Sequence, residues 1–336
     1  MNKHSIILAA GLAFGLGVVA GPPALAADPV KIRLGWAVAP AQIAPIMFDH
    51  PGIAKHFGKS YVMEPVRGTA SAVALNQLAT NDLELAPLTF TQIDPAIHSA
   101  GLTDMRIVAD DFRDGVEGYE TNKWFVQKDG PIQKVADLKG KVIAVPSIGS
   151  GMDVFTRVML RRAGLETPRD YTLVEVVFPN MGAVLVEKKA DMVIGVKPFY
   201  LNPAFAGAAR VLFTQKDAVG PTDMLFLAAR DGWLKKNHAA VVDFFEDMLR
   251  AVRWYNDPKN HDEVVAIAAK FTKIPPERLG WVFTKADFYR DPNAVPDIAS
   301  LQQNVDMLKE LGFIKETVDL KKYTDLSYVK EAAKRL

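Results

Sequence analysis

Short apolar runs alternate with stretches of helical periodicity along most of this chain, and turns rich in Gly, Pro or Ser separate them. Apolar runs between turns are typical of buried strands, whereas apolar positions spaced by three and four predict helices. Strands are expected at Ile32–Trp36, Tyr61–Val66, Leu83–Leu88, Met105–Ala109, Val142–Val145, Thr172–Val177, Met192–Val196 and Met224–Ala228. Helices are expected from the turn at 37–42 to Phe57, and over 72–79, Met152–Ala163, Gly182–Lys189, Ala239–Tyr255, His261–Phe271 and Ile298–Leu311.

A strand, a tight turn, a helix and a further strand occur twice, in separate halves of the chain. The first copy begins at Lys31–Trp36, and the second begins at Lys141–Val145 with the turn 146–151. Such units build a parallel sheet whose turns lie at the carboxyl ends of the strands, where α/β proteins bind ligands. The pattern predicts an α/β protein with two lobes and a cleft between them that closes on a small molecule.

The first 26 residues have the pattern of a secretion signal. Lys3 gives a positive start, Ile6–Ala20 is an apolar stretch, and Ala24-Leu25-Ala26 fits a cleavage site of small residues. A membrane span needs about 20 apolar residues, so the alternative of an uncleaved anchor is the weaker interpretation. Cleavage after Ala26 removes 26 of 336 residues and leaves 310, enough for two domains with their own cores.

The absence of cysteine and the charge balance narrow the function further. The chain contains no cysteine, which excludes disulfides, a lipid-modified cysteine after the signal, cysteine-type zinc sites and thiol catalysis. We therefore expect a protein that is free in the periplasm rather than lipid-anchored. Without Lys3, 39 basic residues balance 39 acidic ones, and this zero net charge argues against a nucleic-acid partner.

Several short motifs follow one another in a characteristic order along nearly the whole mature chain. They are Ile32-Arg33-Leu34-Gly35-Trp36, Gly68 with Ala74-Leu75 and Asp82, Ile132 with Asp137-Leu138-Lys139-Gly140-Lys141, Ala144-Val145, and Arg162-Ala163-Gly164-Leu165. Together they resemble the periplasmic substrate-binding proteins of ABC importers for sulfonates, nitrate, taurine and thiamine precursors. The resemblance implies a type II-like periplasmic binding protein fold, in which each of two lobes is a mostly parallel sheet flanked by helices.

The resemblance also implies a division of the chain. A signal at 1–26 precedes lobe 1, which takes 27–113 and, because the C-terminal helices return to it, 220–336; lobe 2 takes 114–219. Crossings between the lobes are expected near Asp110–Gly118 and Gln215–Pro221. The stretch Phe112–Thr121 departs from the family's pattern, because it is longer and more charged. Its acidic cluster, Asp110, Asp111 and Asp114, is interpreted as a solvated hinge loop rather than as a cation site.

A helix N-terminus in the first half is the main candidate for binding an anion. The first amide groups of a helix are unpaired, and the helix dipole adds positive potential there. Gly68, Thr69, Ala70 and Ser71 lie where the helix after the second strand begins. Their amides and hydroxyls are expected to bind an anionic head group, and the alternative is a simple N-cap.

The corresponding turn in the second half offers fewer donors. Ser150 and Asp153 have the spacing of a capping box, and this carboxylate would repel an anion on the helix axis. Ser147 and Gly149 remain candidate ligand-binding residues from the preceding turn.

Further candidates lie at other strand ends and near the junction of the lobes. Asn180 and Lys197 follow strands of the second half, and Arg113, if buried, would match a carboxylate through its planar guanidinium. Lysine is more often solvated, and aromatic residues more often pack in the core. The aromatic candidates for contact with an organic tail are Trp36, Phe90, Trp124 and Phe199, and Gln42 is a candidate amide contact.

Catalytic and cofactor signals are weak. Gly149-Ser150-Gly151 is not a nucleophile elbow, because Ile148 occupies the position that needs glycine. His50 and His56 are not spaced for a shared helix face. We therefore expect no enzyme activity, no cofactor and no metal.

The function that fits these features is solute capture for an ABC importer. The ligand would be a small organic anion, a sulfonate or an aromatic carboxylate, bound in the cleft by hinge closure. The partners would be an inner-membrane ABC permease and its ATPase, and the protein would be a monomer. Two alternatives stay open: an enzyme of the thiamine-pyrimidine synthase type, which uses a cysteine-rich motif, and a sensor domain that presents its ligand to a receptor.

Overall fold

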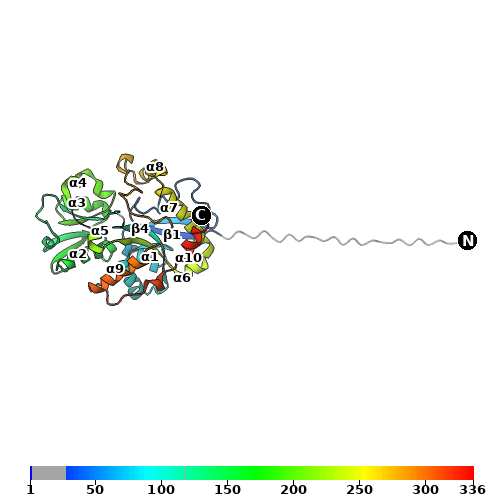
Figure 1. Ribbon diagram of the computed structural model, residues 1–336, viewed down its shortest axis with the longest axis horizontal. Coiled ribbons are helices and arrows are strands. Elements are labelled where there is room, and N and C mark those ends of the chain that lie inside the picture. The colour runs from blue at the N-terminus through cyan, green and yellow to red at the C-terminus, as the bar shows by residue number, and fades with distance from the viewer. Residues whose placement is uncertain (2–27, 117) are drawn as a thin grey trace.

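The protein is a mixed α/β molecule with sheets of two, three and five strands and helices around them (Figure 1); an isolated bridge joins the two smaller sheets, which together are called the first sheet. The computed structural model describes Met1, residues 28–116 and residues 118–336. Except for Met1, the expected signal at 1–26 lies outside the described residues. Within these residues, no helix combines the length and the apolar character needed to cross a bilayer.

The first sheet combines a parallel and an antiparallel part. Strand β1 pairs in parallel with β2, and a parallel bridge between Leu34 and Leu85 connects β1 to the segment before β3. Strand β10 then pairs antiparallel with β3 on one side and β4 on the other. The strands are β1 (Val30–Trp36), β2 (Tyr61–Arg67), β3 (Ala86–Leu88), β4 (Met105–Asp114) and β10 (Thr222–Arg230). We call the part of the chain built on this sheet lobe 1.

The second sheet has five strands in the order β7-β6-β8-β5-β9. Strand β6 pairs in parallel with β7 and β8, whereas β5 pairs antiparallel with β8 and β9. The strands are β5 (Lys123–Gln127), β6 (Lys141–Val145), β7 (Tyr171–Glu175), β8 (Met192–Gly195) and β9 (Ala209–Thr214). We call the part built on this sheet lobe 2. The residue boundaries expected for the lobes stay a prediction.

The helices divide between the two lobes. In Figure 1, the green helices α2 to α5 gather at one end of the molecule, and α6, α7, α8 and α10 gather at the other. The bounds are α1 (Ser71–Ala79), α2 (Gly151–Arg162), α3 (Met181–Val186), α4 (Pro203–Ala208), α5 (Gln215–Val219), α6 (Asp231–Lys236), α7 (His238–Asn256), α8 (His261–Thr272), α9 (Ile298–Glu310) and α10 (Ser327–Ala333). Helix α7 buries one whole face in lobe 1, including Val241, Phe244, Phe245, Met248 and Leu249.

The α/β class is confirmed, and the expected strands and most expected helices form. The helix expected up to Phe57 is wrong: residues 37–59 form turns and a short bridge instead. Pro40, Pro45 and Pro51 interrupt this segment, and each lacks the amide hydrogen that a helix interior needs. The apolar residues of the segment are nevertheless buried, for example Ile43 and Ile46. The spacing of these apolar residues therefore indicates which side chains are buried, but it does not indicate a helix.

The acidic cluster in the expected hinge is not a solvated loop, and that interpretation is wrong. Asp110 and Asp114 lie on β4 and are buried, as is Asp223 on the neighbouring strand β10. The Arg113 Nε lies 2.7 Å from Asp223 Oδ1 and 3.5 Å from Asp110 Oδ2. Asp114 accepts hydrogen bonds from the backbone amides of Thr121 (2.7 Å) and Asn122 (3.0 Å). These carboxylates therefore hold the chain together where it passes from the first sheet to the second.

Burial raises the pKa of all three carboxyl groups, Asp110, Asp114 and Asp223. The pKa of Asp114 is raised to about 7 by burial, although the hydrogen bonds from the amides of Asn122, Thr121 and Gly115 lower it. Burial also raises the pKa of Asp223 to about 7, although Arg113 acts in the other direction. Asp110 has a pKa well above its usual range, again mainly because of burial and then because of Asp223.

We expect the protein to lose stability between pH 5 and pH 8. A carboxyl group whose pKa is higher in the folded than in the unfolded state stabilises the fold most below its unfolded pKa of about 3.9. That contribution is lost as the pH rises through about 7 for Asp114 and Asp223. The free energy of unfolding, measured by urea denaturation, should therefore fall by at least about 1 kcal/mol over this range.

An Asp114→Asn variant tests the cause, because it removes one of the titrating groups. Its unfolding free energy should change less steeply with pH than that of the wild type, whatever its absolute stability. A wild-type stability that is constant or rises from pH 5 to pH 8 would contradict the assignment.

Candidate functional site

A cavity lies between the two lobes, at the carboxyl ends of strands from both sheets. Its empty space, counting the solvent at its mouth, is about 530 Å³, of which about 70 Å³ can hold the centre of a water-sized sphere. Lobe 1 and the adjoining segments contribute Ala37, Val38, Ala41, Gln42, Ala70, Ser71, Thr89, Phe112, Met224, Leu225 and Phe288. The lobe 2 side contributes Asn122, Pro146, Ser150, Gly151, Met152, Phe178 and Val196. None of these described lining residues carries a charged side chain.

Helix α1 begins at the cavity without a cap. Its N-cap residue, Ala70, has an extended backbone, no side chain of the described residues accepts a hydrogen bond from its first turn, and this turn contains no acidic residue. The first amides of any helix have no acceptor within the helix, and the dipole adds positive potential there. The start of α1 is therefore an electropositive position at the cavity that no carboxylate of the helix offsets.

Helix α2 also begins at the cavity, but its N-terminus is occupied. The Ser150 Oγ accepts from the Asp153 amide (3.4 Å), and the Asp153 carboxylate accepts from the Gly149 amide (2.8 Å). Half of the capping box expected from the sequence forms: Ser150 caps the helix, but its own amide donates to the Ser147 carbonyl (3.2 Å), and the Asp153 carboxylate binds the Gly149 amide instead. The Gly151 amide donates to the Ser71 Oγ (3.1 Å), which joins the starts of α2 and α1 across the cleft. With a carboxylate in place, α2 is a poorer site for an anion than α1.

The walls of the cavity are mainly apolar and partly aromatic. Phe112 and Phe288 pack with their ring centroids 4.2 Å apart. Arg290 supports this wall from outside the cavity: it donates to the Ala41 carbonyl (2.6 Å) and pairs with Asp287 (3.0 Å). An organic group of a ligand would therefore meet a wall whose shape is fixed by a buried ion pair.

Gln42 fixes the loop that forms the other side of the cavity. Its Oε1 accepts from the Ala37 amide (2.6 Å) and the Val38 amide (3.2 Å), and its Nε2 donates to Asp111 Oδ2 (3.4 Å). The loop has no regular secondary structure, so its amides need such side-chain partners. Gln42 lines the cavity, but much of its hydrogen-bonding capacity shapes the loop.

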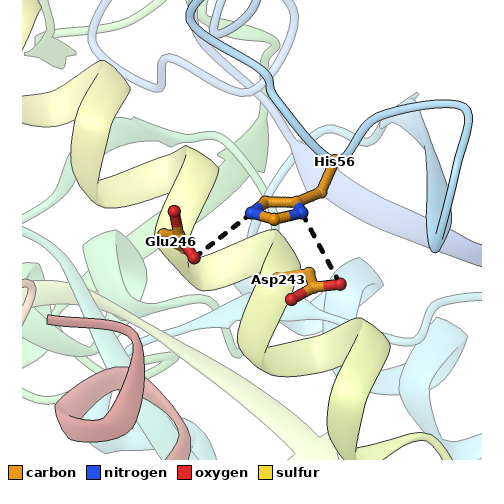
Figure 2. A group of neighbouring side chains, drawn as sticks. All are labelled: His56, Asp243 and Glu246. Carbon is orange, nitrogen blue, oxygen red and sulfur yellow. Dashed lines mark ion pairs between the residues drawn. The ribbon is translucent and has the colours of Figure 1, made fainter. Parts of the chain in front are cut away.

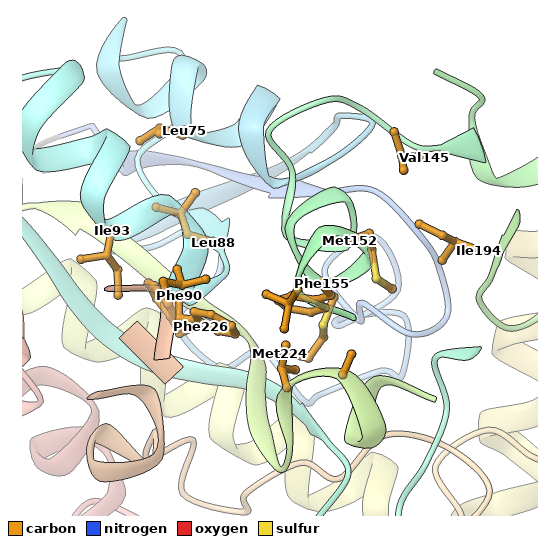
Figure 3. Packing of buried hydrophobic residues seen from close by; sticks show 14 of the residues in the cluster. Leu75, Leu88, Phe90, Ile93, Val145, Met152, Phe155, Ile194, Met224 and Phe226 are labelled. Atoms are coloured by element: carbon orange, nitrogen blue, oxygen red, sulfur yellow. The ribbon is translucent and has the colours of Figure 1, made fainter. Parts of the chain in front are cut away.

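The lobes contact each other closely around the cavity (Figure 3). Phe90 of lobe 1 stacks on Phe155 of α2 with ring centroids 5.3 Å apart, and Gln92 donates to the Gly149 carbonyl (2.8 Å). Lys197 of lobe 2 donates to the Ala286 carbonyl, and its Nζ lies 5.2 Å from the Trp281 ring centroid. Burial lowers the pKa of Lys197. The structure therefore has the geometry of a closed cleft.

The structure brings some of the expected site residues to the cavity and places others elsewhere. Gln42, Ala70 and Ser71 line it, and Trp36 and Gly68 line a smaller space that shares Ala37, Gln42, Ala70, Ser71 and Leu225 with it. Thr69 and Phe199 line a wider groove outside, together with Gly68 and Arg67. The candidates that do not line these spaces are Phe90, Arg113, Trp124, Ser147, Gly149, Asn180 and Lys197.

Their other contacts explain these positions. Trp124 is fully buried, donates to the Thr156 Oγ1 (2.7 Å) and stacks on Phe213. Arg113 is committed to Asp223, Asp110 and the Val295 carbonyl. Phe90, Gly149 and Lys197 form the contacts between the lobes described above.

Several lining residues were missed by the sequence analysis. Thr89 and Phe178 directly follow expected strands, so the rule that ligands bind at strand ends could have identified them. Arg67, whose guanidinium lies 5.4 Å from the Trp36 ring centroid, ends β2 at the outer groove and could have been found in the same way. Phe288 lies in the irregular stretch 279–297, where no periodicity points to a site.

A second group of titratable side chains lies outside the cavity, on α7 and the loop before β2 (Figure 2). The His56 ring lies between Asp243 (3.7 Å) and Glu246 (3.2 Å), a combination of residue types that can bind a metal ion. Each carboxylate also pairs with an arginine: Asp243 with Arg335 (2.8 Å) and Glu246 with Arg250 (2.6 Å). The guanidinium groups already supply positive charge, so this is the geometry of an ion-pair network.

Comparisons with known proteins agree with this architecture. A family model described as NMT1-like matches residues 25–269. No curated protein matches the chain significantly. Among solved structures, the periplasmic aliphatic sulphonate-binding protein SsuA from Escherichia coli is 20% identical, with a TM-score of 0.65; the match covers 88% of this chain and 92% of that protein.

Two further structures show how broadly the fold is used. The periplasmic nitrate-binding protein NrtA from Synechocystis PCC 6803 is 16% identical, with a TM-score of 0.71 over 92% of this chain and 89% of its own. The desulfurization enzyme DSZB is 15% identical, with a TM-score of 0.63 over 91% of this chain and 99% of its own. At sequence identities of 20% or less, these comparisons show that the proteins share a fold. They confirm the expected resemblance to the periplasmic binding proteins of ABC importers.

Proposed function

Because the chain belongs to the NMT1-like family, we propose that it is the periplasmic solute-binding component of an ABC importer and captures a small organic anion between its lobes. Its partners are then a membrane permease and an ATPase, and the protein acts as a monomer. The solved structures that resemble it include binding proteins for a sulfonate and for nitrate, which supports a binding role.

One observation carries the choice of ligand: the uncapped start of α1 faces a cavity with apolar walls. The helix start favours a carboxylate or sulfonate group, since its amides and dipole favour negative charge. The apolar walls favour an alkyl or aromatic group attached to it. Nitrate has no such group and would leave these walls unfilled.

Capture would work by closure of the lobes over the ligand. A ligand shifts the protein toward the closed state only if it binds that state more tightly than the open one. Here the lining comes from both lobes, so full contact is available only when they meet. Arg67 at the outer groove would attract the anion before closure.

Enzyme activity is the alternative, since DSZB has the same fold. The chain has no cysteine, so thiol chemistry is not available to it. Among the described residues that line the cavity, the hydroxyls Ser71, Thr89 and Ser150 have no histidine or carboxylate beside them in the lining to activate them. These observations favour binding without reaction, and turnover of any bound solute by the purified protein would contradict this.

A thermal-shift screen of the mature protein tests the proposal directly. Alkanesulfonates, aromatic carboxylates, nitrate and thiamine precursors form the panel. A ligand at a hundred times its dissociation constant should stabilise the folded state by about 2.7 kcal/mol. A protein that responds to no anion of the panel would contradict the proposed anion binding.

A matched pair of variants places the anion at α1. In Ala72→Asp a carboxylate enters the first turn of the helix and should repel the anion, whereas Ala72→Asn has almost the same shape without the charge. The affinity for the anion that gives the strongest thermal shift should fall about tenfold or more in Ala72→Asp and much less in Ala72→Asn. Equal affinities of the two variants would place the anion elsewhere.

A further inference from the structure

The cavity continues into the outer groove, which carries a positive charge. The inner space of about 70 Å³ has room for about five to seven groups the size of a water molecule, so a larger solute must extend beyond it. The cavity and the groove share Ala37, Val38 and Phe178 in their linings, so a solute can extend from one into the other. Among the described residues that line the cavity, the groove and the smaller space at Trp36, only Arg67 has a charged side chain.

The hydrogen-bond donors of Arg67 are free. Every other arginine of the chain donates to an oxygen atom of the protein. Within residues 28–116 and 118–336, no oxygen atom accepts from the Arg67 guanidinium, and this side chain is exposed. A guanidinium has five N–H donors and no acceptor, so turning the side chain over cannot change what it demands of a partner. Arg67 is therefore available to an anion that enters the groove.

The guanidinium of Arg67 is held in place by a contact that leaves its N–H groups unused. Arg67 and Trp36 are partners in register at the ends of the parallel strands β2 and β1. The guanidinium carbon lies 5.4 Å from the centroid of the Trp36 ring, a favourable cation–π distance. The edge-on contact between Trp36 and Phe271, with centroids 5.7 Å apart, supports the ring in turn. The Gly68 amide donates to the Trp36 carbonyl (2.7 Å) and fixes the turn directly after Arg67.

The lobe 2 side of the outer groove strengthens an ion pair with Arg67. It is apolar and consists of Val177, Phe178, Pro179 and Phe199. The lining, as far as the structure describes it, contains no acidic residue that could compete for the guanidinium. Attraction between opposite charges is stronger beside such apolar surface than in open water. The groove therefore favours a negatively charged group over a neutral one.

We propose that the solute is an organic dianion, whose second anionic group binds the Arg67 guanidinium in the outer groove. This inference rests on the proposed function and narrows its ligand class. The first anionic group lies at the start of α1, and the alkyl or aromatic part follows the walls that the cavity and the groove share. Ala70 and Ser71 line the cavity, whereas Arg67 lines the groove, so the two groups occupy separate positions. A carboxylate is the natural second group, because it accepts two parallel hydrogen bonds from a guanidinium.

Calorimetric titration of the full mature protein with matched pairs of probes tests this. Each pair contains a dianion and its monoamide, which has nearly the same shape and one charge less: terephthalate and 4-carbamoylbenzoate, 4-sulfobenzoate and 4-carbamoylbenzenesulfonate, and the dicarboxylates from succinate to suberate with their monoamides. At least one dianion should bind about tenfold or more tightly than its monoamide. Titration at about 0.15 M salt screens the general attraction between the protein and any dianion.

Variants of Arg67 connect the preference to this residue. In Arg67→Gln the preference for the dianion should disappear, while the affinity for the monoamide changes less than about threefold. Arg67→Lys should keep part of the preference, since it retains the charge but not the planar pair of donors. Lys31→Gln is the matched control: Lys31 is an exposed cation of the neighbouring strand β1, pairs with Glu64, and lines none of the three spaces. This control should keep the wild-type preference.

The outcomes separate the two proposals. Equal binding of dianion and monoamide in every pair overturns the second anionic position but leaves anion capture intact. A preference that survives in Arg67→Gln also overturns it. Equal losses of affinity for both members in Arg67→Gln would place a single anionic group at Arg67 and would likewise overturn it. Failure of every monoanion and dianion to bind overturns the proposed function, and this inference with it.

Discussion

Replacing Gly151 by alanine should weaken ligand binding by about 5- to 150-fold while leaving the unfolding free energy almost unchanged. Gly151 is the first residue of α2, where lobe 2 meets lobe 1. A Cβ atom at this position would lie 2.6 Å from the Thr89 Cγ2 and 2.8 Å from its Oγ1. Carbon atoms in folded proteins do not approach so closely, so either the lobes or the Thr89 side chain must move.

The effect should fall on closure because the clash is between the lobes. Within α2 itself alanine is a better helix former than glycine, so lobe 2 loses nothing locally. Overpacking in a tight contact costs about 1–3 kcal/mol, and in this protein the lobes can avoid that cost by staying apart. The Gly151 amide would then also lose the Ser71 Oγ. A reduced population of the closed state lowers the apparent affinity by the same factor.

Gly207→Ala is the matched control. Gly207 lies in α4 of the same lobe, and a Cβ atom there would meet nothing within 4 Å. The control should bind ligand with wild-type affinity, whereas Gly151→Ala should bind weakly and give a more extended particle in small-angle X-ray scattering with ligand present. Wild-type affinity for Gly151→Ala would mean that this contact does not limit closure.

Much of the fold could be predicted from the sequence, because strands and helices with strong periodicity were packed as expected. The exception is the segment 37–59, where a helix was expected and turns form. Apolar spacing in that segment reflects burial against lobe 1, and only the prolines indicate that the backbone is irregular. Strand β9 (Ala209–Thr214), at the edge of the second sheet, was missed although Val211, Leu212 and Phe213 form a short apolar run.

Site residues that directly follow a single strand could be predicted from the sequence. Site residues that come together from two distant segments could not. The start of α1 at Ala70 and Ser71 follows a strand and a glycine turn, and it lines the cavity as expected. Phe112 and Phe288 lie far apart in the sequence, and only the fold brings their rings together. Lys197 follows a strand as expected, yet it contacts the opposite lobe, because strand ends at an interface between lobes can bind either a ligand or the other lobe.

Replacing Asp247 by alanine should lower the unfolding free energy by about 3 kcal/mol or more. Asp247 lies on α7, is completely buried, and supports the irregular segment 37–59 that also forms the loop at the cavity. Its carboxylate accepts from the backbone amides of Lys55 (2.9 Å) and His56 (2.8 Å) and from the Tyr61 hydroxyl (2.9 Å).

The size of the expected loss follows from what remains after the substitution. Alanine would leave two amides and the buried Tyr61 hydroxyl without an acceptor, and each unpaired buried donor costs about 1–3 kcal/mol. It would also remove the partner of Arg250, whose Nη1 lies 2.6 Å from the Asp247 Oδ1. The segment has no helix or strand at these positions to supply other partners, so its backbone depends on this one carboxylate.

Asp243→Ala is the control from the same helix, one turn earlier. Asp243 is partly exposed and takes part in ion pairs with Arg335 and His56, and loss of such pairs usually costs about 1 kcal/mol or less. Urea denaturation of both variants should therefore separate them clearly. If Asp247→Ala is destabilised no more than Asp243→Ala, the segment must be held by its apolar contacts, and the carboxylate on α7 does not position the loop at the cavity.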